Sequence, residues 1–110
     1  MILKELRTEF GAVSSAIISR DGTLLAGDIS GSVTLETLTI MCATMMGAAV
    51  TAHSGLRIGQ PKMIRLTSDK HEMFVAGVGH KAILITVVPK GTRVDALQQR
   101  LYKIVDTWHE

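Results

Sequence analysis

Residue types that commonly carry out chemistry are few and scattered in this 110-residue chain. The four histidines, at positions 53, 71, 80 and 109, lie far apart, and none has a second ligand-type residue at metal-binding spacing. The single cysteine, Cys42, excludes an intramolecular disulfide and any cysteine-based metal cluster. Since Cys42 has no basic neighbours in sequence, a small buried hydrophobic residue is favoured over a reactive thiol. The sequence therefore predicts no metal site.

Two glycine-rich segments superficially resemble nucleotide-binding motifs. Residues 77–82 fit the GxGxxA fingerprint, but that motif requires a following helix, and residues 83–88 are typical of a strand. We therefore interpret Gly77 and Gly79 as hairpin glycines. The segment at residues 27–32 precedes a predicted helix but has no lysine in the P-loop position. The sequence thus predicts no cofactor and no nucleotide binding by this chain itself.

Composition restricts the function further. The net charge of +2 is too small to indicate a nucleic-acid partner, and 46% hydrophobic residues exclude intrinsic disorder. The acidic residues are dispersed without an evident acid/base pair, and Ser14-Ser15 lacks the context of a nucleophile. The charged N-terminus does not resemble a signal peptide. We therefore expect a cytoplasmic protein that is not an enzyme.

The elements that position these residues follow from hydrophobic periodicity and turn signals. Ile2, Leu3, Leu6 and Phe10 predict an amphipathic helix that ends at Gly11. Residues 20–23 (Arg-Asp-Gly-Thr) predict a hairpin turn. Short connections through His71 and His80 predict an antiparallel meander, and Gly91-Thr92 are expected to cap the last helix. The predicted elements are strands at 12–19 and 24–28, a helix at 33–54 with Gly55 near its end, strands at 62–68, 72–78 and 82–88, and a helix from Val94 to Trp108.

The element order is therefore α-β-β-α-β-β-β-α. It predicts a single α+β domain over residues 1–110, in which one five-stranded antiparallel sheet is sandwiched between helices.

The long central helix has two distinct uncharged faces at 100° per residue. One is an ordinary core stripe through Leu35, Leu38, Cys42, Met46 and Ala49. The opposite one consists of Thr37, Ile40, Thr44, Ala48 and Thr51, flanked by Met41 and Gly47. No acidic residue, lysine or arginine occurs from Thr37 to Leu56, whereas a solvent-facing side normally carries such charges. The distributed threonines exclude a membrane span, so we expect another protein surface to cover this face.

Residues 11–26 resemble the opening hairpin of the Roadblock/dynein light chain family. The uncharged helix with Met45-Met46-Gly47-Ala48-Ala49 and the closing strand at residues 83–89 are similar too. The element order agrees over nearly the whole chain. The resemblance implies a Roadblock/longin/profilin-like fold.

The resemblance also implies a non-catalytic homodimer that binds and modulates, or scaffolds, a small Ras-like GTPase. Family members dimerise through the long helix and one edge strand, which places Ile64 and Leu66 in the interface beside the helix residues 37, 40, 41, 44, 47, 48 and 51. Any stimulation of hydrolysis by an inserted arginine would involve Arg20, Arg57 or Arg65.

Two alternatives remain open. Folds of this layout also occur in profilin-like domains that sense small molecules, whose ligands fill aliphatic pockets. A motor or cytoskeletal light chain without GTPase contact is the other alternative.

Overall fold

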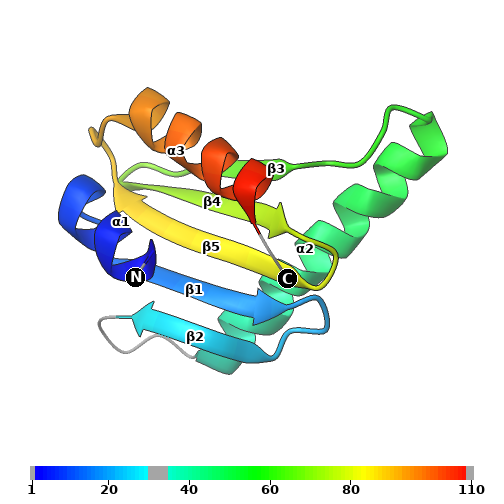
Figure 1. Cartoon of the computed structure of the whole chain (residues 1–110), viewed down its shortest axis with the longest axis horizontal. Coiled ribbons are helices and arrows are strands. Elements are labelled where there is room, and N and C mark those ends of the chain that lie inside the picture. Colours follow the sequence, from blue (N-terminus) through cyan, green and yellow to red (C-terminus); the bar gives the residue numbers. More distant parts are fainter. Residues whose placement is uncertain (1, 30–34, 109–110) are drawn as a thin grey trace.

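The predicted order of elements is confirmed by a computed structural model, which describes residues 2–29 and 35–108. The described residues form three helices and five strands in the order α-β-β-α-β-β-β-α, and Figure 1 shows their arrangement. The helices are α1 (Ile2–Phe10), α2 (Leu35–Leu56) and α3 (Val94–Thr107); the strands are β1 (Ser14–Ser19), β2 (Leu24–Ile29), β3 (Met63–Thr67), β4 (His71–Val78) and β5 (Ala82–Pro89).

The five strands form one antiparallel sheet in the order β2-β1-β5-β4-β3. The central β5 pairs with β1 and β4, and the two hairpins β1–β2 and β3–β4 extend the sheet on either side. Within the described residues, strands β2 and β3 are therefore the edges, and each has one side without a neighbouring strand.

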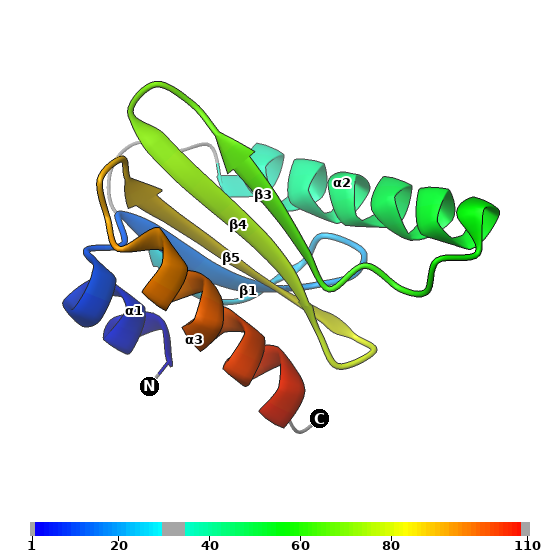
Figure 2. The ribbon, with the colours of Figure 1, turned by 90° about the horizontal axis from the view of Figure 1, so that it is seen from above.

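Helices cover both faces of the sheet, as Figure 2 shows. Helices α1 and α3 lie side by side on one face, over a core that includes Leu6, Phe74 and Leu101. Helix α2 crosses the other face, over a core that includes Cys42, Met46 and Ile85. The central strand β5 therefore reads as a nearly continuous apolar run, because both of its faces are buried.

The β1–β2 hairpin confirms the predicted turn. Gly22 has φ +95°, which other residues rarely adopt. The carboxylate of Asp21 accepts hydrogen bonds from the Ser19 hydroxyl and from the Thr23 amide. These bonds hold the pKa of Asp21 below its ordinary value, with the Ser19 bond as the largest cause.

The end of α2 differs from the prediction, which placed it at residue 54 beside Gly55. The helix continues two residues further, because a helical glycine costs only about 1 kcal/mol. The chain reverses at Arg57, whose φ is +56°, and the Ile58 amide donates to the His53 carbonyl at 3.2 Å. This bond is typical of a Schellman helix end. The predicted helix start at 33–34 and the break at 30–32 lie outside the described residues.

The predicted cap of α3 is wrong. Arg93, not Thr92, occupies the N-cap position, and no side chain caps the helix there. The Thr92 hydroxyl instead donates to the Pro89 carbonyl at 2.7 Å, and Gly91 adopts φ +93°. Both residues therefore complete the turn that follows β5.

The remaining strand boundaries shift by one or two residues. Strand β1 starts at Ser14 rather than at residue 12, because the Ala12 amide still bonds the Leu6 carbonyl at the end of α1. His71, predicted in a turn, is the exposed first residue of β4. Gly77, interpreted from sequence as a hairpin glycine, lies inside β4, whereas Gly79 adopts φ +63° in the β4–β5 turn.

Candidate interaction surface

Helix α2 has one side against the sheet and one side in solvent. Cys42 and Met46 are buried, and Leu38 and Ala49 are half-buried, as the predicted core stripe requires; the side chain of Leu35 lies outside the described part. Burial raises the pKa of the Cys42 thiol. The thiol is therefore protonated near neutral pH, in agreement with a packing role.

The opposite side of α2 is exposed. We call it the outer face of α2, and it consists of Thr37, Ile40, Met41, Thr44, Gly47, Ala48 and Thr51, all of which are exposed. Ile40 is 43% exposed and Met41 is 50% exposed. This face carries no charged side chain, so two large apolar residues and a row of small ones meet water. Such a surface is typical of a protein interaction site.

Two threonines of the outer face, Thr44 and Thr51, satisfy their hydroxyls within the helix. Thr44 donates to the Ile40 carbonyl at 2.8 Å, and Thr51 donates to the Gly47 carbonyl at 3.0 Å. A hydroxyl bonded in this way needs no partner on an opposing surface. These threonines can therefore be buried in an interface without leaving an unpaired polar group.

Edge strand β3 supplies the other predicted interface residues. Leu66 is 38% exposed and lines a shallow hollow of about 380 Å³ together with Met73 and Val87. Ile64 is half-buried and packs against the core under α2. Among the described strands β3 pairs with β4 alone, so the backbone along its outer side is available to another strand.

Two exposed apolar residues at the end of α2 were not predicted from sequence as part of the interface. Leu56 is 69% exposed and Ile58 is 61% exposed, and both lie at the end of α2 that extends past the strands (Figures 1 and 2). Their signal was present in the sequence as apolar residues on either side of the helix end. They enlarge the apolar surface available at this end of the helix.

On the other face of β3, the charged and polar side chains are held in place by hydrogen bonds and ion pairs. The Glu72 carboxylate, on a buried residue, accepts hydrogen bonds from Arg65 at 3.3 Å and from the Thr67 hydroxyl at 2.8 Å, and Lys90 lies 3.9 Å away. The Arg65 bond is the largest cause that holds the pKa of Glu72 below its ordinary value. Arg65 also lies over the Phe74 ring at 5.7 Å.

The three arginines considered for insertion into a GTPase differ in availability. Arg65 is held by Glu72, and Arg20 donates to the Gly79 carbonyl at 3.1 Å. Arg57 is exposed at the end of α2. The structure does not bring these three side chains together at one site.

Within residues 2–29 and 35–108, no three histidine, cysteine or acidic side chains gather where a metal ion could be held. In the same ranges no helix is long and apolar enough to cross a membrane.

A family model described as the Roadblock/LC7 domain matches residues 1–88, which include α1, α2 and most of the sheet. The chain belongs to the Roadblock/LC7 domain family. No curated protein sequence matches it.

Solved structures of Roadblock proteins have the same fold. A structure described as MglB with a tetrameric arrangement is 20% identical, has a TM-score of 0.81, and matches over 96% of this chain and 85% of that chain. The gliding protein MglB of Thermus thermophilus is 22% identical, with a TM-score of 0.79 over 96% and 86% of the two chains. The profilin of Schizosaccharomyces pombe, 14% identical, has a TM-score of 0.68 over 94% and 93%. The predicted Roadblock and profilin-like fold is thus confirmed.

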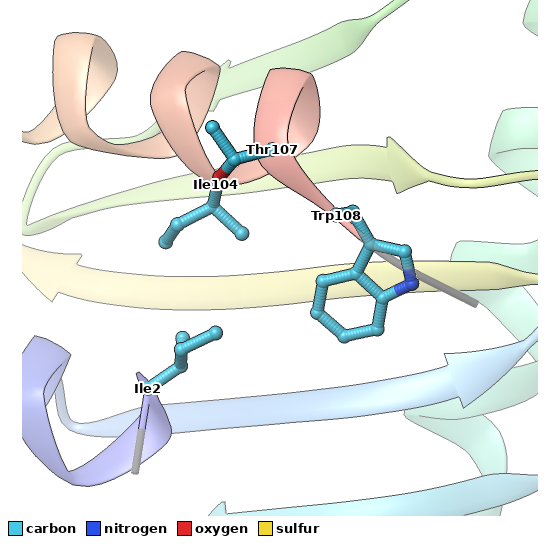
Figure 3. A pocket seen from close by; sticks show the side chains of 4 residues that line it. All are labelled: Ile2, Ile104, Thr107 and Trp108. Atoms are coloured by element: carbon cyan, nitrogen blue, oxygen red, sulfur yellow. The ribbon is translucent and has the colours of Figure 1, made fainter.

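This Roadblock chain has a further, smaller hollow on the other side of the sheet. Figure 3 shows it between Ile2 of α1 and Ile104, Thr107 and Trp108 at the end of α3, with a volume of about 270 Å³. The Thr107 hydroxyl already donates to the Lys103 carbonyl at 2.7 Å. The hollow is therefore mainly apolar, and it favours no particular ligand.

Proposed function

We propose that this Roadblock protein is a non-catalytic, homodimeric regulatory or scaffold module that binds a small Ras-like GTPase in the cytoplasm. The observation that carries the proposal is the outer face of α2, which is exposed and free of charge next to the open edge of β3. Membership of the Roadblock/LC7 family and the fold similarity to the gliding protein MglB support the regulatory role.

Self-association explains why the outer face of α2 lacks charges. Two copies related by a two-fold axis would bury Ile40 and Met41 against each other's helix, and would let the β3 edges meet. Burial of a few such side chains contributes about 1.5–3 kcal/mol each when complete. The small residues Gly47 and Ala48 would permit a close helix approach. The tetrameric arrangement described for one MglB supports self-association as a property of related chains.

The GTPase partner is proposed from family membership. The sequence lacks a P-loop lysine, so we expect nucleotide dependence to come from the GTPase and not from this chain. Stimulated hydrolysis, where it occurs, would come mainly from ordering the residues of the GTPase itself.

A pulldown tests the partnership directly. The immobilised protein is incubated with small GTPases of the same organism, each loaded with GDP or with a non-hydrolysable GTP analogue. We expect one GTPase to be retained with a preference for one nucleotide state. Retention of none in either state, with the immobilised protein shown to be folded, would reject the GTPase role. Saturable binding of labelled GTP to the isolated protein would contradict the absence of nucleotide contact.

The similarity to the profilin fold supports a small-molecule sensor as the alternative function. Native mass spectrometry of the purified protein separates the two, because a sensor would carry a bound compound of fixed mass. A light chain of a motor complex without GTPase contact would give neither result.

A further inference from the structure

A groove of about 920 Å³ lies at one end of the sheet, away from the outer face of α2. Figure 1 shows the end of β1, the β4–β5 turn and the segment after α2 at this end. The groove is lined by basic residues from these three places, namely Arg20, His80 and Lys62, and by the apolar Val50, Pro61 and Val105. No acidic side chain is among its described lining residues.

Arg20 has an unsatisfied donor at this groove. Its Nη2 group donates to the Gly79 carbonyl at 3.1 Å, but its buried Nε–H has no hydrogen-bond acceptor in the part of the chain that the structure describes. An unpaired buried donor on a charged group is costly. Within the described residues, no carboxylate forms an ion pair with Arg20. The guanidinium therefore lacks both an acceptor for its Nε–H and a counter-charge.

Gly77 provides the space that holds this guanidinium. A Cβ atom at position 77 would lie 2.8 Å from Nη2 and 3.5 Å from Cζ of Arg20. Gly77 has no positive φ and sits in regular pairing opposite Ile83 on β5. Its backbone conformation does not require glycine. The absence of a side chain at Gly77 lets the Arg20 guanidinium lie against β4. This contact fixes the position of the planar, forked set of N–H donors of the guanidinium, which we call the fork.

We propose that this groove binds a small organic anion through a carboxylate or phosphate group. The guanidinium of Arg20 donates to the oxyanion, since its planar shape matches carboxylate and phosphate oxygens. The apolar part of the ligand lies against Val50, Pro61 and Val105. A groove of this volume is in the range of small-molecule sites.

The other charges at the groove agree with an anion. Lys62 pairs with Asp106 at 3.7 Å, but both side chains are 62% exposed, and such a pair is weak in water. The Lys62 ammonium therefore still contributes positive potential at the groove. This site goes beyond the proposed function: none of the residues placed in the dimer interface lines it, so either proposal can fail without the other.

The Arg20 Nε–H resonance reports on the site without any GTPase. The isolated protein is titrated with inorganic phosphate, acetate, phenyl phosphate and benzoate, against sodium chloride at matched ionic strength, and followed by ¹H–¹⁵N NMR. We expect a saturable shift of the Arg20 Nε–H resonance with at least one oxyanion, and tighter binding of its phenyl form. Comparison of the phosphate titrations with the carboxylate titrations identifies the head group that the groove binds.

Three variants separate a built site from general charge attraction. Gly77→Ala keeps every charge but displaces the Arg20 fork, and Arg20→Lys keeps the charge without the fork. We expect both to weaken binding by about tenfold or more. The control Arg57→Gln removes an equal charge from a neighbouring segment that does not line the groove, and it should bind as the parent does. Amide spectra of all variants establish that they are folded.

Three results would overturn the proposal. The first is an Arg20 Nε–H resonance that responds to the oxyanions no more than to chloride. The second is unchanged affinity in folded Arg20→Lys, which preserves only the charge. The third is an equal loss of binding in Arg57→Gln. Equal affinity for the bare and phenyl-bearing ions would reject the apolar contact with Val50, Pro61 and Val105.

Discussion

The Thr44 hydroxyl bonds the Ile40 carbonyl at 2.8 Å, one turn earlier in α2, although Thr44 is exposed. Because the helix itself satisfies this hydroxyl, Thr44 needs no water molecule or partner side chain as acceptor. The middle of the outer face of α2 is therefore less polar than its sequence suggests. This is the position where two crossing copies of α2 would meet.

Replacement of Thr44 by arginine should separate a dimer formed through this face. Two arginines near a two-fold axis would be desolvated and would repel each other, at a cost of about 3 kcal/mol or more. This corresponds to an increase in the dimer Kd of about 100-fold or more. Sedimentation equilibrium measures the change, and Thr8→Arg, on the exposed side of α1, is the matched control. A Thr44→Arg variant with the parent's Kd would place the interface elsewhere.

Leu38→Arg should act on folding instead of association. Leu38 packs against the core under α2, so a charge there is brought into an apolar environment without a partner. We expect a marked fall in Tm measured by circular dichroism at a concentration where the parent is monomeric. Thr44→Arg should leave the monomer Tm within a few degrees of the parent, since its side chain is exposed.

Gly47→Ala should stabilise the monomer and weaken the dimer. No atom lies within 4 Å of a Cβ placed at Gly47 or at Gly55, so alanine fits both helical sites and should add about 0.5–1 kcal/mol of stability. Only Gly47 lies on the outer face of α2, where an added methyl group separates two close helices. We therefore expect a raised dimer Kd for Gly47→Ala alone. Equal dimer Kd values for the two variants would argue against close approach at Gly47.

Stability should depend on the ionisation of Glu72 in acid. Its pKa in the folded chain is below the ordinary value of 4.5, mainly because Arg65 donates a hydrogen bond to the carboxylate. The stabilisation is therefore fully present above pH 4.5 and is lost as the pH falls through the lower, folded-state pKa. Urea unfolding of the parent and of Glu72→Gln should show a difference that shrinks below pH 4.5.

Gly22→Ala should destabilise the chain. Gly22 has φ +95°, a backbone conformation that alanine rarely adopts. A Cβ at this position would also lie 3.3 Å from the Cα of Ile40, because the β1–β2 turn packs closely against α2. We expect a loss of about 1–3 kcal/mol in the free energy of unfolding, measured by urea titration. Gly27→Ala is the control, because Gly27 has no positive φ and its nearest neighbours are side-chain atoms at 3.5 Å. An equal loss of unfolding free energy in Gly27→Ala would show that the positive φ of Gly22 is not the cause.

The types and order of the elements could be predicted from sequence because each rests on local periodicity. Both faces of α2 were also predictable, since the absence of charge from Thr37 to Leu56 is a property of the sequence itself. Helix ends were less predictable. Thr92 is a good N-cap type, but its hydroxyl is engaged by the turn after β5.

The groove at Arg20 could not be predicted, because it depends on residues distant in sequence. Arg20 and Gly79 are 59 positions apart and meet only when β1 and the β4–β5 turn lie at the same end of the sheet. The pairing of Arg65 and Glu72 was easier to predict from sequence, because both residues lie in the predicted β3–β4 hairpin. Register alone decides which side chains of a hairpin meet, and register depends on the turn.

The β2 edge limits how far such a sheet could polymerise. The register shift between Ile17 and Ile18 leaves Leu25 as an extra residue on β2, and the Asp28 carboxylate on the same strand pairs with Arg7 at 3.1 Å. A bulge and a fixed charge both discourage a further strand from adding to an edge. In an assembly that joins two sheets through their β3 strands, the two ends of the joined sheet would therefore both be β2 edges, which resist the addition of a further strand. Growth would stop at a finite ribbon, and fibres would not form.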